Sequence, residues 1–142
     1  AAEADAAGLN PLVGLVGTGG IDKPDRRHRR AWMGAVENTE ITVNELPDDA
    51  VVLDVREPGE WAAGRARNAV HIPLGLLPTR LADLPAVDGA LPVVCRSGVR
   101  SARAVVYLGT QGVEATNVAG GMQAWEEAGK ALVADSGHPT VV

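Results

Sequence analysis

The stretch Val51-Val52-Leu53-Asp54-Val55 decides the fold, because a continuous apolar run of this length is typical of a strand buried on both faces of a parallel sheet. Outward from it, further short apolar segments predict strands at residues 41–43, 69–72, 91–95 and 115–118. The first of these is expected at the edge of the sheet.

Helix signals separate the predicted strands. Pro58 suits a first helical turn, and Gly64 is placed to end that helix. Three apolar stripes predict further helices, and their members are Leu74, Leu77, Leu81 and Leu84, then Ala102, Val105, Val106 and Gly109, and last Met122 and Trp125. Strands that alternate with helices imply parallel crossovers, so the sequence predicts a three-layer α/β domain.

Length and composition bound the possible functions. A chain of 142 residues is long enough for one domain with a proper core. Its net charge of −5 argues against a dedicated nucleic-acid binder, and it has no apolar run long enough to cross a membrane. The single cysteine excludes an internal disulfide and a metal site built from several cysteines, and it fits a reducing compartment. A cytoplasmic location is therefore expected.

The chain is expected to divide into a flexible N-terminal arm at 1–38, a domain at 39–134 and a C-terminal tail at 135–142. The arm contains a basic cluster, Arg26-Arg27-His28-Arg29-Arg30, which could contact a nucleic acid or an acidic partner. A solvated tail is the favoured interpretation, because nearby acids and the acidic chain as a whole offset this charge.

The chemistry is expected after the predicted strand at 91–95, where Cys95-Arg96-Ser97-Gly98-Val99-Arg100-Ser101 leads directly into a helix. Ligands of open parallel sheets bind at the carboxyl ends of the strands. A helix N-terminus favours an anion, Gly98 lets several N–H groups point at one sulfur, and Arg96 and Arg100 add positive charge. We therefore predict that the pKa of Cys95 lies well below the usual value of about 8.5.

An inert core cysteine is the alternative interpretation, because free cysteines are among the most buried residues. Two arginines beside an inert buried thiol would face an unexplained desolvation cost, which favours the reactive interpretation. None of His28, His71 and His138 lies near Cys95 in the sequence, and the carboxylates show no metal-binding spacing. We expect neither a metal site nor a cofactor.

Three segments together resemble the rhodanese-type sulfurtransferases, particularly the single-domain ones. They are the Cys95–Ser101 loop, the segment Leu53-Asp54-Val55-Arg56-Glu57-Pro58-Gly59-Glu60-Trp61, and the segment Val118-Ala119-Gly120-Gly121-Met122-Gln123-Ala124-Trp125. The resemblance implies a five-stranded parallel sheet with helices on both faces. It also implies a double displacement in which Cys95 takes sulfane sulfur from a donor, as a persulfide, and passes it to a nucleophile.

By the same resemblance, Arg96, Ser97, Gly98, Val99, Arg100 and Ser101 form a cradle for the sulfur, and Asp54 and Arg56 brace the loop. The residues themselves favour a structural role for Asp54 and Arg56, because buried charges must pair. The expected partners are a small anionic donor, with thiosulfate preferred, and a thiol, cyanide or protein acceptor. The segment 64–69 departs from the family pattern, and its extra arginines could favour anions.

Two other functions remain open. A cysteine-dependent phosphatase or arsenate reductase would place an arginine after five intervening residues, whereas Arg100 follows Cys95 after four. The second alternative function is that of a rhodanese-like binding module without turnover, although inactive members of the family typically lack the cysteine.

Overall fold

The computed structural model describes residues 39–142. The expectations for the arm at 1–38, including the basic cluster and His28, lie outside the described residues. Along the chain the elements are β2 (Glu40–Ile41), η1 (Val43–Glu45), β3 (Leu53–Asp54), α2 (Pro58–Ala63), β4 (Val70–His71), η2 (Leu74–Thr79), η3 (Leu81–Asp83), β5 (Leu91–Val94), α3 (Val99–Thr110), β6 (Ala115–Val118) and α4 (Gly121–Glu127), where η marks a 3-10 helix.

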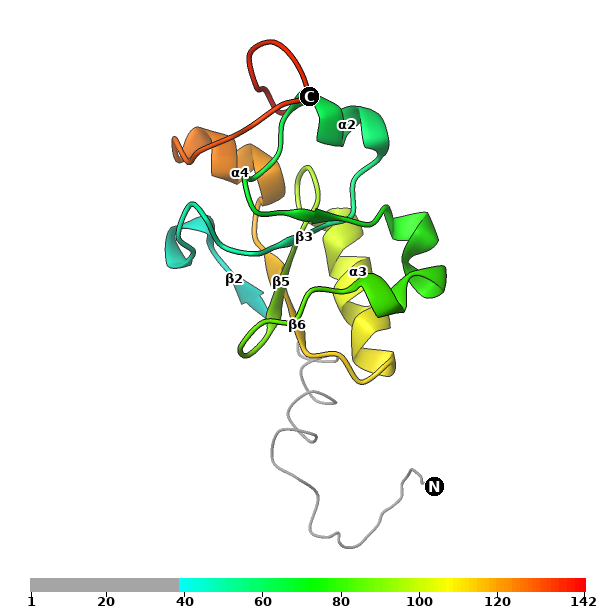
Figure 1. Ribbon diagram of the computed structural model, residues 1–142. Coiled ribbons are helices and arrows are strands. Elements are labelled where there is room, and N and C mark those ends of the chain that lie inside the picture. Colours follow the sequence, from blue (N-terminus) through cyan, green and yellow to red (C-terminus); the bar gives the residue numbers. More distant parts are fainter. Residues whose placement is uncertain (1–38) are drawn as a thin grey trace, which may run out of the picture. The chain divides into compact units, whose positions relative to one another are not determined.

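The sheet has five strands in the order β2-β6-β5-β3-β4, and every neighbouring pair is parallel (Figure 1). All five predicted strands are present, with β2 at an edge as expected. The three-layer α/β prediction is confirmed. β5 lies at the centre of the sheet, so the loop that follows it emerges between the ends of β3 and β6.

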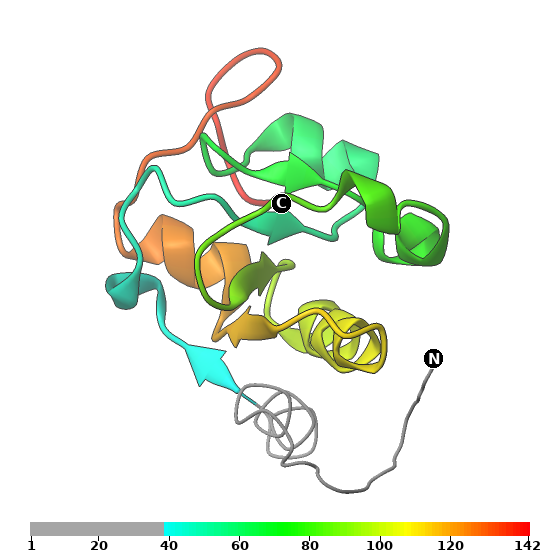
Figure 2. The same cartoon turned by 60° about the horizontal axis from the view of Figure 1, so that its bottom comes forward.

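Helices cover both faces of the sheet (Figure 2). A separate hydrophobic core lies on each face. Side chains alternate along a strand, so Leu91, Val93 and Cys95 face α3, whereas Val94 faces α4. The α3 core also contains residues of η2, and the α4 core is built around Met122 and Trp125. Cys95 is thus the last residue of an inward-facing row.

The leucine stripe at 74–84 forms two 3-10 helices, η2 and η3, and not the single amphipathic helix that its spacing predicts. Pro78 explains the difference, because proline has no N–H group and its ring clashes with the carbonyl four residues earlier in an α-helix. The leucines still reach the core: Leu77 is fully buried, and Leu74, Leu81 and Leu84 pack beside it.

The predicted stripe on α3 is partly wrong. Val106 is half exposed, and the buried face consists of Ser101, Ala104, Val105 and Leu108. These four residues follow one another at three- and four-residue spacing from the start of the helix. Ser101 therefore occupies a position on the buried and otherwise apolar face of α3, next to Cys95.

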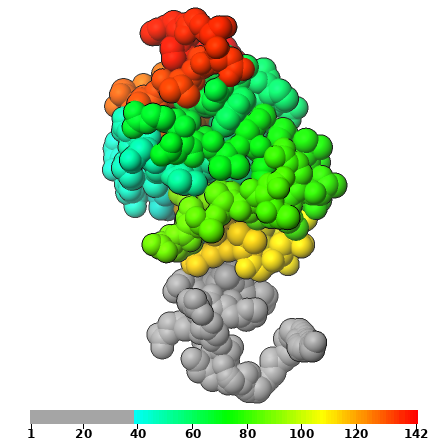
Figure 3. Space-filling view, viewed as in Figure 1, coloured from blue at the N-terminus to red at the C-terminus, as the bar shows by residue number. Residues whose placement is uncertain are grey.

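The segment 135–142, called the strap below, bends at residues 135–138 and packs against the domain, and it is seen in red at the surface in Figure 3. The N–H groups of Asp135 and Thr140 donate to the carbonyls of Ala62 and Ala63 in α2, at 3.0 and 2.9 Å. The N–H of Val141 donates to the Glu126 carboxylate of α4 at 3.2 Å. The strap thus joins α2 to α4.

Candidate active site

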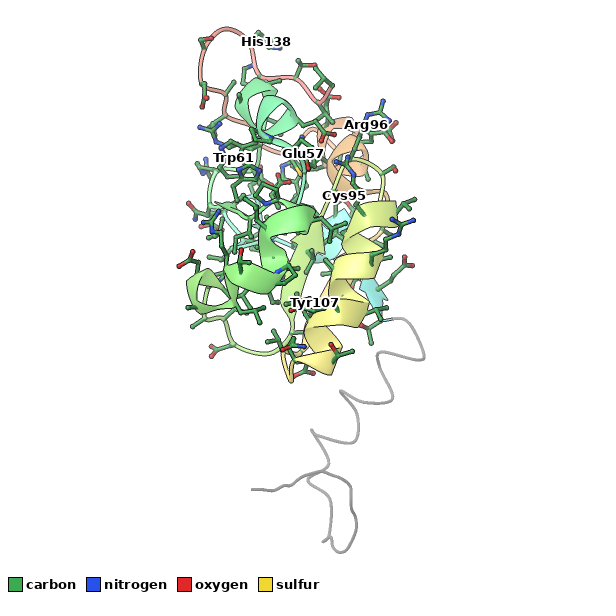
Figure 4. The ribbon with its side chains drawn as sticks, turned by 90° about the vertical axis from the view of Figure 1, so that its right-hand side faces the viewer. Glu57, Trp61, Cys95, Arg96, Tyr107 and His138 are labelled. Carbon is green, nitrogen blue, oxygen red and sulfur yellow. The ribbon has the colours of Figure 1, made fainter. Side chains whose placement is uncertain are left out.

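Cys95 lies directly after β5 and is 1% exposed. Figure 4 shows it at the same end of the described domain as Arg96 and Glu57, whereas Tyr107 lies farther along α3. This is the carboxyl end of the parallel sheet, where the sequence predicts the chemistry.

Backbone N–H groups converge on the sulfur. The N–H of Gly98 donates to the Cys95 Sγ at 3.0 Å. Gly98 has φ of 112°, in the left-handed region, and it caps the N-terminus of α3. That conformation turns the chain sharply enough for the loop to wrap around a single atom, which is why a glycine occupies the position.

The pKa of the Cys95 thiol is lowered from its ordinary value. Burial acts to raise the pKa, but the hydroxyl of Ser101 and the N–H groups of Ser101, Gly98 and Ser97 together outweigh burial. The direction agrees with the prediction from the sequence. The main stabilising groups are hydrogen-bond donors of the loop, which were predicted together with the positive charge of the two arginines.

Both arginines of the loop have partners other than the sulfur. Arg100 forms a bidentate ion pair with Glu60 of α2, with both N···O distances 2.8 Å. Arg96 donates from Nε to the carbonyl of Val142 at 2.9 Å, and the Gln123 Oε1 accepts from its Nη2 and Nη1 at 3.2 and 3.3 Å. Glu60 balances the charge of Arg100, whereas Arg96 is held by a main-chain oxygen of Val142 and by the amide of Gln123.

The start of α4 holds the outer side of the loop. The N–H groups of Met122 and Gln123 donate to the carbonyls of Cys95 and Arg96, at 2.8 and 3.0 Å. A Cβ on Gly121 would collide with both of these carbonyls, and Gly121 has a positive φ of 56°. Because the carbonyls point at α4, the N–H groups of the same loop are free to point at the sulfur.

Asp54 and Arg56 are fully buried and pair with each other. The Arg56 Nη2 lies 2.7 Å from the Asp54 Oδ2. Arg56 also donates from Nη1 to the carbonyl of Glu60 at 3.3 Å and from Nη2 to the carbonyl of Gly64 at 2.7 Å. The pair therefore holds α2 directly. It reaches the cysteine loop only through Glu60, whose carboxylate binds Arg100.

Glu60 and Asn117 are the two polar residues near the site that the sequence analysis did not single out. Glu60 lies in the first turn of α2, where its carboxylate accepts a hydrogen bond from the N–H of the N-cap residue Glu57 at 2.9 Å, so its signal in the sequence is that of a helix start. Asn117 lies in β6 and is 2% exposed, and an asparagine in a buried strand is itself a signal because it needs hydrogen-bond partners. Its Oδ1 accepts from the Ser101 hydroxyl at 2.6 Å.

The remaining predicted positions lie around the loop. Val99 is 64% exposed on the first turn of α3. His71 stacks on Trp61 with ring centroids 4.6 Å apart, and its Nε2 lies 2.8 Å from the carbonyl oxygen of Arg56. Arg65, one of the extra arginines of segment 64–69, pairs with Asp135 at 2.8 Å.

Within residues 39–142, no group of three or more His, Cys, Asp or Glu side chains is arranged to hold a metal ion. In the same part of the chain, no helix is both long and apolar enough to cross a membrane.

Comparison with known proteins assigns the family. The model of the rhodanese-like domain matches residues 40–128, which include the whole site described above. The chain belongs to the rhodanese-like domain family.

Relatives of this rhodanese-like domain include a sulfurtransferase of Allochromatium vinosum, which is 37% identical over 91 residues that cover 63% of this chain and 84% of the relative. The crystal structure of a rhodanese-related protein from Thermoplasma volcanium is similar with a TM-score of 0.60 and 35% identity, over 67% of this chain and 97% of that one. A rhodanese-like domain protein from Staphylococcus aureus has a TM-score of 0.55 and 39% identity, over 61% and 90% of the two chains. The rhodanese fold inferred from the three motifs is thus confirmed.

Proposed function

We propose that this rhodanese-like protein is a sulfurtransferase that carries sulfane sulfur as a persulfide on Cys95. The observation that carries the proposal is the convergence of loop N–H groups on the sulfur, with a lowered thiol pKa. A thiolate held in this way is a soft nucleophile suited to attack on another sulfur. The name of the Allochromatium relative supports the same reaction class.

The proposed reaction has two displacements. With thiosulfate as donor, the Cys95 thiolate attacks the outer sulfur, the S–S bond of the donor breaks, and sulfite leaves with the bonding electron pair. The product is the persulfide Cys–S–S⁻. An acceptor such as cyanide then attacks the terminal sulfur, thiocyanate leaves, and the thiolate is restored. Neither step requires an outside oxidant or reductant.

A small anionic donor is favoured by Arg96. Its side chain is exposed next to Cys95 in the sequence and carries a permanent positive charge. Thiosulfate is the preferred donor, because a guanidinium group suits a small dianion. The proposed acceptors are cyanide, a thiol or a protein sulfur acceptor. A lone cysteine also favours a reducing compartment, and we propose a cytoplasmic location.

Intact-mass spectrometry after incubation with thiosulfate tests the proposal directly. We expect a gain of about 32 Da, one sulfur atom, that disappears when cyanide is added. Cys95 is the only cysteine, so a Cys95→Ser variant is a complete control and should show no gain. A parent protein that stays at its original mass with thiosulfate and with other persulfide donors would contradict the proposal.

A further inference from the structure

The hydroxyl of Ser101 lies between two acceptors. Its Oγ is 2.6 Å from the Asn117 Oδ1 and 3.3 Å from the Cys95 Sγ. A serine hydroxyl has only one proton and can donate it to only one of them at a time. All three residues are at most 2% exposed, so water cannot readily replace the missing donor.

The amide of Asn117 is fixed with its oxygen toward Ser101. Its Nδ2 donates to the carbonyl of Gly98 at 3.1 Å and to the Glu40 carboxylate at 3.3 Å. A flipped amide would place Oδ1 against these two acceptors. The short Oγ–Oδ1 distance therefore marks a hydroxyl proton that is held by Asn117, with a lone pair of Oγ directed at the sulfur.

We propose that Asn117 is a positioning residue that competes with Cys95 for the single hydroxyl proton of Ser101. While Cys95 is a neutral thiol, its S–H donates to the Ser101 Oγ and Ser101 donates to Asn117. When the thiol loses its proton to solvent, the hydroxyl must turn toward the sulfur, and Asn117 loses its donor. Asn117 thus makes the free thiolate less stable than the loop alone would make it.

The consequence for sulfur transfer rests on the proposed function. In a persulfide the charge lies on the outer sulfur, so the Sγ no longer needs the Ser101 proton. The hydroxyl can then return to Asn117 and restore the shorter bond. The competition therefore favours the sulfur-loaded state over the free thiolate.

The substitutions at Asn117 change no charged residue, but they remove the Nδ2 donor from the Gly98 carbonyl and from the Glu40 carboxylate. Arg100 interacts electrostatically with Cys95 and also carries the ion pair with Glu60. Charged side chains near the loop and its partners include Glu40 of β2, Asp54 of β3, Arg56 after β3, Glu57 and Glu60 at the start of α2, and Arg96 and Arg100 of the loop itself.

The test is an ultraviolet titration of the Cys95 thiolate, with a Cys95→Ser counterpart of each variant as the blank. Asn117→Leu keeps the size of the side chain and removes the acceptor. We expect its thiolate titration midpoint to fall by about one pH unit, because the Ser101 proton becomes available to the sulfur. Thr116→Val, a buried neighbour in the same strand, is the matched control and should leave the midpoint in place.

The same substitution in a Ser101→Ala background separates competition from distortion of the loop. If Asn117 acts through the Ser101 proton, Asn117→Leu has no effect on the midpoint in that background. An unchanged or raised midpoint in the single variant, or an equal shift in both backgrounds, overturns the proposal. Asn117→Val is the second variant, and circular dichroism checks that each protein is folded.

The titration needs no sulfur donor, so the two proposals fail separately. A midpoint shift together with absent persulfide formation would count against sulfur transfer and leave the role of Asn117 standing.

Discussion

At the scale of single residues, the reactivity of Cys95 depends on where the peptide groups of its loop point. The N–H groups of Ser97, Gly98 and Ser101 act on the sulfur, and the nearby guanidinium groups bind elsewhere. The place of Cys95 at the end of a strand and the turn at Gly98 could be predicted, because both depend on residues next to each other in the sequence. The partners of Arg100 and Ser101 could not, because Glu60 and Asn117 are distant in the chain and only the fold brings them close.

The position of Arg100 leads to a prediction about substrate class. A cysteine-dependent phosphatase needs its arginine to bind phosphate oxygens, but the Arg100 guanidinium is held by both oxygens of Glu60. We therefore expect the protein to form thiocyanate from thiosulfate and cyanide, and not to hydrolyse p-nitrophenyl phosphate. Both reactions can be followed by colour, with Cys95→Ser as the common control. The reverse pattern of activity would favour a phosphatase.

At the scale of elements, α2 links the buried Asp54–Arg56 pair to the start of α3. Arg56 donates to carbonyls of α2 and its C-terminal cap, and the Glu60 side chain of α2 binds Arg100. The sequence indicated α2 correctly from Pro58 and Gly64, since a helix start and a helix stop are local signals. The single helix predicted at 74–84 is wrong, because the leucine spacing alone predicts it and Pro78 inside the segment interrupts a continuous α-helix.

Acid should loosen the contact between α2 and α3. Hydrogen bonds from Arg100, which outweigh burial, lower the pKa of Glu60 from 4.5 to about 2. A carboxyl group whose pKa is lower in the folded state stabilises the fold above its unfolded pKa. That contribution is lost as the pH falls from 4.5 to about 2.

Glu60→Gln tests this prediction in urea unfolding. At neutral pH we expect the free energy of unfolding to fall by about 1–2 kcal/mol, less than the full pKa shift implies because Arg100 is 32% exposed. The difference from the parent protein should shrink as the pH falls toward 2. Asp83→Asn removes the exposed pair with Arg80 and is the control, with an expected loss below about 0.5 kcal/mol. A constant difference at all pH values would rule out ionisation of Glu60 as the cause.

At the scale of the described domain, the strap at 135–142 closes over elements that are far apart in the sequence. It bonds to α2 and α4, and the carbonyl of Val142 accepts from Arg96 of the cysteine loop. The predicted domain ends at residue 134 and leaves this segment outside it. The segment has neither apolar periodicity nor a helix signal. Its contacts are mainly made by backbone groups, which leave no pattern in the sequence.

Gly64 provides a test of the strap. Its φ of 177° is ordinary extended backbone, but a Cβ there would lie within 2.8 Å of the Thr140 backbone nitrogen. We expect Gly64→Ala to lower the free energy of unfolding by about 1–3 kcal/mol, because the strap must move away. In a protein lacking residues 135–142 the same substitution should cost nothing. Gly59→Ala, where nothing lies within 4 Å, is the control and should stabilise α2 by up to about 1 kcal/mol.

The parent, the Gly64→Ala variant, the protein lacking residues 135–142 and the protein with both changes form a double-mutant cycle, measured by thermal or chemical denaturation. An equal cost of Gly64→Ala with and without the strap would show that the glycine is required for another reason.

The hydrogen bonds between α4 and the cysteine loop also have a consequence for biosynthesis. The amides of Met122 and Gln123 orient the carbonyls of Cys95 and Arg96, and they leave the ribosome later than the loop does. Before α4 has folded against the loop these two hydrogen bonds are absent, so the N–H groups of the loop are not yet fixed toward the sulfur. We therefore expect the pKa of the Cys95 thiol to reach its folded-state level only after Met122 and Gln123 have been synthesised and have packed against the loop.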